Sequence, residues 1–299
     1  MRVVLYVFSG TGNTLKVASL IKRYMNADVT VYRISEKSGK APSPEGFDLV
    51  GVGYPIHAFN APEPVLKFAE RLPEVAYRRA FVFKSSGEGL HLNDCSSQKL
   101  IKIMKSKGYD VTLERHVVMP YNMIYRHSDE MAKQMWIYAK AYVKLICEEL
   151  ESFKREPVKQ PFYKWWYAPF LRVVEQKFAH LHGPLFKVNV NKCLECNRCV
   201  SVCPENNISV KDGKYKFGHK CVLCMGCSFG CPADAISVGV FGLWKVNGSY
   251  RLEELAHDDS LTFPLVPNYA KGIYRIYKKY YREVDERLES AGISVSEYV

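Results

Sequence analysis

Short apolar runs alternate with segments of helical periodicity through the first half of the chain. A continuous apolar run predicts a strand at 3–8, and further strands are expected at 29–34, 49–52, 80–84 and 111–118. Apolar residues at helical spacing predict helices at 15–21, 64–72, 96–107 and 129–153. Strands that alternate with helices and lack polar positions are typical of a parallel sheet covered on both faces. We therefore expect an α/β fold with a doubly wound, five-stranded parallel sheet.

The rest of the chain has less regular patterning. Residues 267–292 predict an amphipathic helix that ends at Gly292. Its apolar face is expected to hold Ile273, Ile276 or Tyr277, Tyr280, Val284 and Leu288. Residues 154–187 combine clustered aromatics with seven Lys or Arg and two acidic residues, and a helix is expected over 169–180. We interpret this segment as an interdomain strut, and a membrane-surface helix is the alternative.

Eight of the ten cysteines form two copies of the spacing C-x2-C-x2-C-x3-C-P. Two-residue gaps let a tight loop aim three thiolates at one iron–sulfur cube, whereas the fourth cysteine faces away. Two structural zinc sites are the alternative, because paired C-x2-C elements also bind zinc. Three thiolates in so short a loop favour the cube. The first copy is Cys193, Cys196, Cys199 and Cys203, and the second is Cys221, Cys224, Cys227 and Cys231.

The repeat extends beyond the cysteines, since 203–210 align with 231–238 at a constant offset. Residues 186–239 thus resemble the bacterial ferredoxin with two [4Fe-4S] clusters. In that family the fourth cysteine of each run ligates the other cluster. The resemblance implies Cys193, Cys196, Cys199 and Cys231 for cluster one, and Cys221, Cys224, Cys227 and Cys203 for cluster two. It also implies that Ile208 and Ile236 pack over the clusters.

The loop after the first strand has the composition of an anion site. Three hydroxyl residues alternate with two glycines directly before a helix, where free backbone N–H groups and the helix dipole favour negative charge. The loop lacks the lysine of a P-loop and the third glycine of a dinucleotide fingerprint. A plain helix cap is the alternative. The loop closely resembles the FMN-phosphate loop of flavodoxins, and its residues are Ser9, Gly10, Thr11, Gly12, Asn13 and Thr14.

The flavodoxin resemblance implies that two further loops, 53–62 and 85–91, meet the flavin ring. Tyr54 or Phe59 is expected to stack on the ring, and the segment 119–123 is expected to edge the pocket. Neither loop contains Trp, so one face of the flavin is expected to be open. The candidate proton donors are His57, Tyr54 and His91. The remaining expected flavin contacts are Pro55, Asn60, Ser86, Gly87, Glu88 and Gly89.

Together these segments resemble a flavodoxin–ferredoxin fusion. We expect a flavin domain at 1–153, a connecting segment at 154–185, a cluster domain at 186–239 and a C-terminal extension at 240–299. The predicted function is electron transfer between two [4Fe-4S] clusters and FMN, and on to a redox partner. The alternative is an oxidoreductase in which FMN reduces a small organic substrate. A third hypothesis is a cluster module on a docking scaffold without FMN.

Charge and composition limit which partners and which cellular compartment are expected for the protein. The formal charge of +11 falls to about +5 once two clusters of about −2 each and a phosphate of about −2 are counted. The cluster segment 188–238 carries six Lys or Arg and four acidic residues, which favours an acidic redox partner. The spread of basic residues does not favour nucleic acid. The sequence shows no signal peptide and no apolar run of spanning length, so a cytoplasmic protein is expected, with membrane association not favoured.

Overall fold

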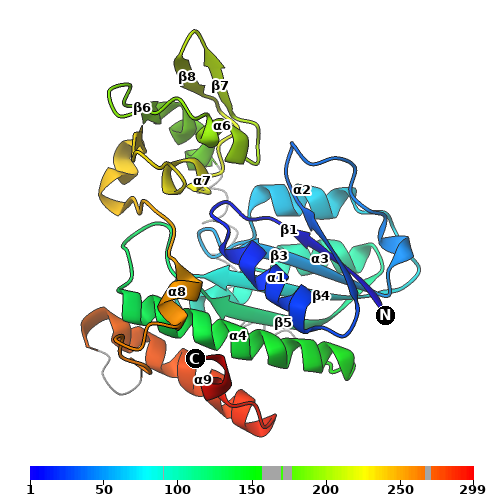
Figure 1. The fold of residues 1–299 in the computed structure, drawn as a ribbon. Helices are drawn as coiled ribbons and strands as arrows, with labels where there is room; N and C mark the ends of the chain where they lie inside the picture. Colours follow the sequence, from blue (N-terminus) through cyan, green and yellow to red (C-terminus); the bar gives the residue numbers. More distant parts are fainter. Residues whose placement is uncertain (90, 157–169, 171–176, 267–270) are drawn as a thin grey trace.

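A five-stranded parallel sheet forms the centre of the first half of the molecule (Figure 1). The computed structural model describes residues 1–299 except 90, 157–169, 171–176 and 267–270. The strand order is β2-β1-β3-β4-β5, which is the flavodoxin-like order and confirms the predicted fold class. The strands are β1 Arg2–Val7, β2 Asp28–Arg33, β3 Leu49–Pro55, β4 Arg78–Ser86 and β5 Tyr109–Val118.

Helices cover both faces of the sheet because alternate strand residues point to opposite sides. Val3, Leu5 and Val7 pack in the same core as helices α1 (Asn13–Tyr24) and α4 (Asp129–Glu151). Val4 and Tyr6 pack in the core on the other face, beneath the remaining helices. Those are α2 Glu63–Arg71 and α3 Gln98–Ser106. Two 3-10 turns lie in the connections, η1 Pro44–Gly46 between β2 and β3 and η2 His91–Cys95 between β4 and α3.

A small lobe lies over the carboxyl edge of the sheet, beside the loop between β1 and α1 (Figure 1). Two antiparallel pairs build it, β6 (Lys187–Val188) with β9 (Ile236–Ser237) and β7 (Ile208–Lys211) with β8 (Lys214–Phe217). Its other elements are η4 Gly183–Leu185, α6 Arg198–Val202 and α7 Gly226–Phe229. The lobe therefore has the small α+β architecture that was predicted.

The C-terminal extension packs along α4 (Figure 1). Its helix α9 (Lys278–Ser290) is shorter than predicted, because the 3-10 turn η6 (Gly272–Tyr277) precedes it. A 3-10 turn advances three residues per turn and so rotates the side chains before α9 out of the α-helical register. Ile273 and Ile276 are consequently 53% and 37% exposed, and Tyr277 and Tyr281 are buried. The other elements are η5 Gly239–Trp244, α8 Leu252–Ala256 and η7 Val295–Tyr298.

Buried ion pairs also fasten the extension to the sheet. Arg115 on β5 binds Glu149 on α4 at 2.8 Å and Glu156 at 2.6 Å. Arg287 on α9 binds Glu156 at 2.8 Å. Hydrogen bonds from Arg287 and the positive charge of both guanidinium groups hold the pKa of Glu156 at about 2, although partial burial opposes this. The pairs place α9 at a fixed position against β5 and α4.

The predicted helix over 169–180 falls mostly outside the described residues. Within the described part, residues 177–182 are helical and lead into the small lobe. His180 from this stretch lies 2.9 Å from the Glu63 carboxylate at the start of α2. No helix among the described residues combines the length and apolar character needed to cross a bilayer.

Candidate flavin and cluster sites

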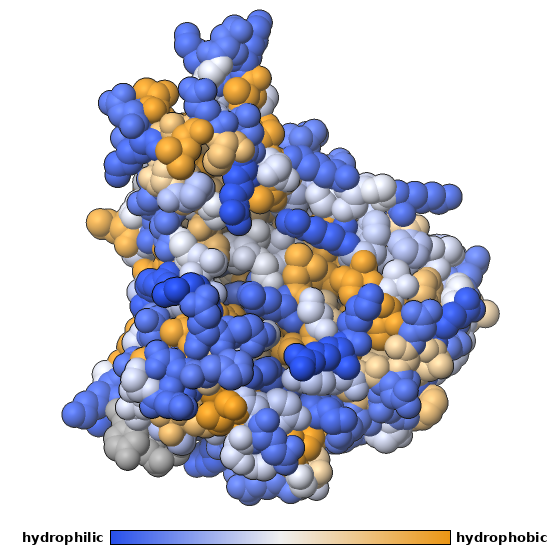
Figure 2. Space-filling view, in the orientation of Figure 1, coloured by the Kyte–Doolittle hydropathy of each residue, from blue (hydrophilic) through white to orange (hydrophobic). Residues whose placement is uncertain are grey.

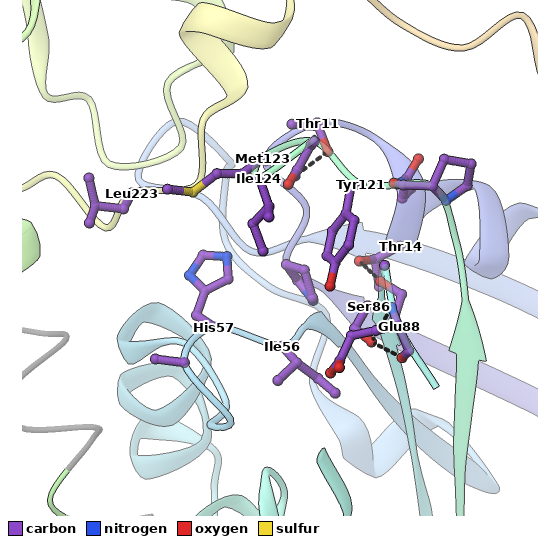
Figure 3. A pocket seen from close by; sticks show the side chains of 18 of the residues that line it. Thr11, Thr14, Ile56, His57, Ser86, Glu88, Tyr121, Met123, Ile124 and Leu223 are labelled. Atoms are coloured by element: carbon purple, nitrogen blue, oxygen red, sulfur yellow. Dashed lines mark hydrogen bonds between the residues drawn. The ribbon is translucent and has the colours of Figure 1, made fainter. Parts of the chain in front are cut away.

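A cavity of about 430 Å³ lies at the carboxyl ends of β1, β3, β4 and β5 (Figure 3). Three predicted loops line it, and the segment 120–124 after β5 forms a fourth wall. Leu223 and Phe241 reach the cavity from outside the flavodoxin-like fold. The cavity is large enough for a cofactor and lies where flavodoxin-like sheets bind ligands.

The loop of residues 9–14 is ordered by its own hydroxyl groups. The Gly12 N–H donates to Ser9 Oγ at 3.2 Å, and Thr14 Oγ1 lies 2.9 Å from Ser85 Oγ. Asn122 donates to Thr11 Oγ1 at 2.9 Å. The helix α1 starts within this segment, at Asn13, and has no acidic residue in its first turn, so its dipole favours an anion here. All loop residues except Gly12 line the cavity.

Most predicted ring contacts line the same cavity, but Tyr54 does not. Strand β3 continues three residues past the predicted end, and its alternation points Tyr54 into the core below α3. Tyr54 is fully buried there, with its hydroxyl 3.3 Å from Ser96 Oγ. The prediction that it stacks on flavin or donates a proton is therefore corrected. The predicted residues that do line the cavity are Pro55, His57, Phe59, Ser86, Gly87 and Glu88.

Two other predicted contacts have structural roles beside the cavity. Asn60 is buried, and its backbone pairs with His57 to close the turn that carries Ala58 and Phe59. Gly89 lies against the ring of Tyr280, where a side chain on Gly89 would clash.

Tyr121, which lies outside the two predicted loops, supplies an aromatic side chain to the cavity wall in addition to Phe59 (Figure 3). Its ring lies so close to Gly87 that a Cβ there would overlap it. The ring is also stacked on His127, with centroids 5.1 Å apart and 19° between the planes. The segment 119–123 was expected to edge the pocket, but no local pattern distinguishes Tyr121, which lines the cavity, from Tyr54, which does not.

The candidate proton donors differ in their surroundings. Burial lowers the pKa of His57 to about 4, so its ring is neutral at pH 7 although it lines the cavity. His91 begins η2, but its side chain lies outside the description. Glu88 lines the cavity with 8% of its surface exposed, and burial raises the pKa of its carboxyl. Asn93 donates a hydrogen bond to this carboxyl.

The eight repeat cysteines line two separate small cavities. Each cavity combines three thiols of one run with the last thiol of the other run. Backbone N–H groups of Glu195, Asn207 and Ala235 point at sulfur atoms, at 3.3–3.4 Å from Cys193, Cys203 and Cys231. Within the described ranges, no three His, Cys, Asp or Glu side chains are arranged to hold a single metal ion. The first cavity holds Cys193, Cys196, Cys199 and Cys231, and the second holds Cys203, Cys221, Cys224 and Cys227.

Ile236 lines the first of these cavities and Ile208 the second, each less than 6% exposed. They come from β9 and β7, the strands that follow the two cysteine runs. The two isoleucines thus shield the thiol cavities from water on one side.

The loop 221–227 packs directly on the loop 9–14. A methyl group at Gly10 would lie 2.5 Å from the Cys224 carbonyl oxygen, and one at Gly226 would lie 2.5 Å from the Gly10 carbonyl oxygen. Leu223 from this loop lines the cavity at the carboxyl ends of the strands. By contrast, the corresponding loop of the other run lies within 189–199, where every residue except Cys193 and Cys199 is exposed. The two cysteine runs therefore have different surroundings, one against this cavity and one facing solvent.

Comparisons with known proteins match these two parts separately. Residues 186–209 match the family model of the 4Fe-4S binding domain. A search of curated proteins finds no match. Similar solved structures include flavodoxin 1 from Bacillus cereus, with 20% identity, covering 46% of this chain and 95% of that one, at a TM-score of 0.33.

Two further solved structures cover the same half. A flavodoxin from the domain Archaea has 18% identity over 50% of this chain and 99% of that chain, at a TM-score of 0.35. A flavoprotein in complex with FMN from Lactobacillus acidophilus NCFM has 12% identity over 38% of this chain and 92% of that chain, at a TM-score of 0.32. The chain thus joins a domain of flavodoxin-like strand order to a 4Fe-4S binding domain.

Proposed function

We propose that the chain binds FMN and two [4Fe-4S] clusters and transfers electrons between them and a redox partner. The clusters supply one-electron chemistry, and FMN accepts one or two electrons. The contact between the loops 9–14 and 221–227 carries the proposal, because it brings one cysteine run to the wall of the flavin cavity.

The thiol sets support two clusters with crossed ligands. Each small cavity contains four thiols, three from one run and one from the other. Burial raises the pKa of Cys221 to about 11 and that of Cys224 to about 12, so these thiols need a bound cation to exist as thiolates at pH 7. The iron of a cluster supplies that positive charge, and N–H groups directed at sulfur tune the reduction potential of the cluster.

The hydroxyl-rich loop supports FMN. Replacing Thr11 and Thr14 together with valine should raise the dissociation constant for FMN by at least about tenfold, because two donors to the phosphate are lost. Flavin fluorescence during titration of the purified protein measures this. Ser19→Ala is a matched control, since its hydroxyl bonds to Leu15 O on the exposed side of α1. Unchanged affinity in the double variant would contradict the assignment of this loop.

The reductase alternative needs a proton donor at the cavity. His57 is neutral at pH 7 and Tyr54 lies in the core, which leaves Glu88, whose buried carboxyl has a raised pKa, as the candidate donor among the described residues of the cavity. Electron transfer needs no such group, and the paired thiol cavities and the loop contact serve it directly. We therefore favour electron transfer as the function.

We further propose that the partner docks at the exposed loop 189–198. Lys192 and Arg198 are exposed there beside Leu194, which is 67% exposed. Over 187–220 the chain has seven Lys or Arg and three acidic residues, and Figure 2 shows hydrophilic and hydrophobic residues side by side on this lobe. A basic face with an apolar contact suits an acidic redox protein.

Charge reversal tests this docking face. Lys192→Glu with Arg198→Glu should slow electron transfer to an acidic small ferredoxin by about tenfold at low salt, and the difference should shrink as salt is added. Stopped-flow absorbance follows the rate. Lys279→Glu on α9, which is similarly exposed, should leave the rate unchanged. A wild-type rate independent of ionic strength would count against an acidic partner.

A further inference from the structure

A buried hydrogen-bond chain joins the C-terminal extension to the flavin cavity. Tyr277, the last residue of η6, is fully buried, and its hydroxyl donates to the Gly87 carbonyl oxygen at 2.5 Å. The same hydroxyl lies 2.8 Å from His127 Nε2. Because Gly87 lines the cavity, these hydrogen bonds link the cavity wall to a residue 190 positions later in the sequence.

The direction of each hydrogen bond in this chain is determined. His127 Nδ1 accepts the backbone N–H of Tyr121 at 3.1 Å, so the ring proton resides on Nε2. Burial lowers the pKa of His127 to about 3, which keeps the ring neutral at pH 7. The Nε2–H therefore donates to Tyr277 Oη, and the hydroxyl proton of Tyr277 goes to Gly87 O. Each donor in the chain has an acceptor.

Ring stacking adds a second link between the extension and the cavity. The ring of His127 is stacked with that of Tyr121, an aromatic residue of the cavity wall, and with that of Tyr274 from η6 at 6.0 Å and 15°. Tyr274 Oη also accepts the Ser128 N–H at 2.8 Å. The position of Tyr121 against Gly87 therefore depends on residues of the extension.

A third contact lies on α9. The Tyr280 ring occupies the space beside Gly89, and its hydroxyl accepts the Val118 N–H at 3.1 Å and donates to His116 O at 3.2 Å. Both segments that wall this side of the cavity, 86–89 and 118–124, are thus held by tyrosines of the extension.

We propose that Tyr277 is a positioning residue of the flavin site. By donating its hydroxyl proton to the Gly87 carbonyl, it fixes the loop 86–88 in the conformation that receives the flavin ring. The inference rests on the proposed binding of FMN, and it makes the C-terminal extension part of the cofactor site rather than a separate appendage.

Tyr277→Phe tests the proposal in the full-length protein. We expect the dissociation constant for FMN to rise about tenfold, because the buried Gly87 carbonyl loses its donor and the loop relaxes. The reduction potential and visible spectrum of the bound flavin should also shift, which a purely structural role far from the ring would not cause. Tyr281→Phe is the matched control, since Tyr281 is also buried and its hydroxyl has no hydrogen-bond partner among the described residues.

The possible outcomes separate the two proposals. Wild-type affinity, potential and spectrum in Tyr277→Phe, with FMN bound normally by the wild type, would overturn the positioning role alone. A wild-type protein that takes up no FMN would overturn both proposals. Should Tyr277→Phe not fold, His127→Phe keeps the ring stack and the Tyr277–Gly87 hydrogen bond but removes the Nε2–H donor that orients the Tyr277 hydroxyl. It should weaken FMN binding in the same direction by a smaller factor, and unchanged affinity, potential and spectrum there would overturn the positioning role.

Discussion

Replacing Gly226 with alanine should slow the reduction of bound flavin through the clusters by about tenfold. The new methyl group would lie 2.5 Å from the Gly10 carbonyl oxygen, and backbone stands on both sides of the contact, so neither loop can yield by changing a rotamer. Overpacking of this kind costs about 1–3 kcal/mol, which is enough to separate two docked loops. The cysteine run in the loop 221–227 would then move away from the flavin cavity. Stopped-flow mixing with a one-electron reductant measures the rate.

A reciprocal variant and a control make this prediction specific. Gly10→Ala creates the same overlap from the other side, 2.5 Å from the Cys224 carbonyl oxygen, without altering the cysteine run. Gly242→Ala in the same small lobe meets no atom within 4 Å and should behave like the wild type. Iron and flavin contents must stay at the wild-type level for the rates to be compared. Wild-type rates in both loop variants would rule out a role of this contact in electron transfer.

The sheet was predictable because its central strands β1 and β3 are buried on both faces and consist almost entirely of apolar residues and glycine. The ends of the strands were less so. Gly51 and Gly53 weaken the apolar pattern of β3, yet the strand continues to Pro55, and this extension places Tyr54 in the core. The spacing of Val50, Val52 and Tyr54 at alternate positions was the available signal. Strand pairing with β4 through residue 55 overrides the local composition.

The local loops were predictable, whereas contacts distant in sequence were not. The loop 9–14 and the cysteine spacing carry their chemistry in a few consecutive residues. Leu223 and Tyr277 reach the flavin cavity or its wall only through tertiary packing, and nothing near them in sequence indicates this. The segment 119–123 was expected at the pocket, but its composition does not reveal that the Tyr121 ring forms part of the wall. The start of α9 was also misjudged, because the apolar spacing does not reveal the 3-10 turn before it.

Removing Cys231 should empty the cluster made mainly by the other cysteine run. The thiol of Cys231 lines the cavity of Cys193, Cys196 and Cys199, so Cys231→Ala is expected to lose about half of the iron. The absorbance spectrum of the remaining cluster should persist, and this cluster should still reduce the flavin, because the thiols beside the flavin cavity are untouched. Cys147→Ala is the control, because this buried thiol donates a weak hydrogen bond to the Ile21 carbonyl oxygen and lies far from the small lobe in sequence.

Double variants decide between crossed and uncrossed ligands. Removing two ligands of one cluster should lose no more iron than removing one of them, because a single removal already empties that cluster. Cys231→Ala combined with Cys193→Ala should lose about half of the iron, the same as either single variant. Cys231→Ala combined with Cys221→Ala should lose nearly all of it. Uncrossed ligation predicts the reverse pattern, since Cys221 and Cys231 would then serve one cluster. Iron analysis of protein purified without oxygen distinguishes the two, and it does so independently of whether FMN is bound.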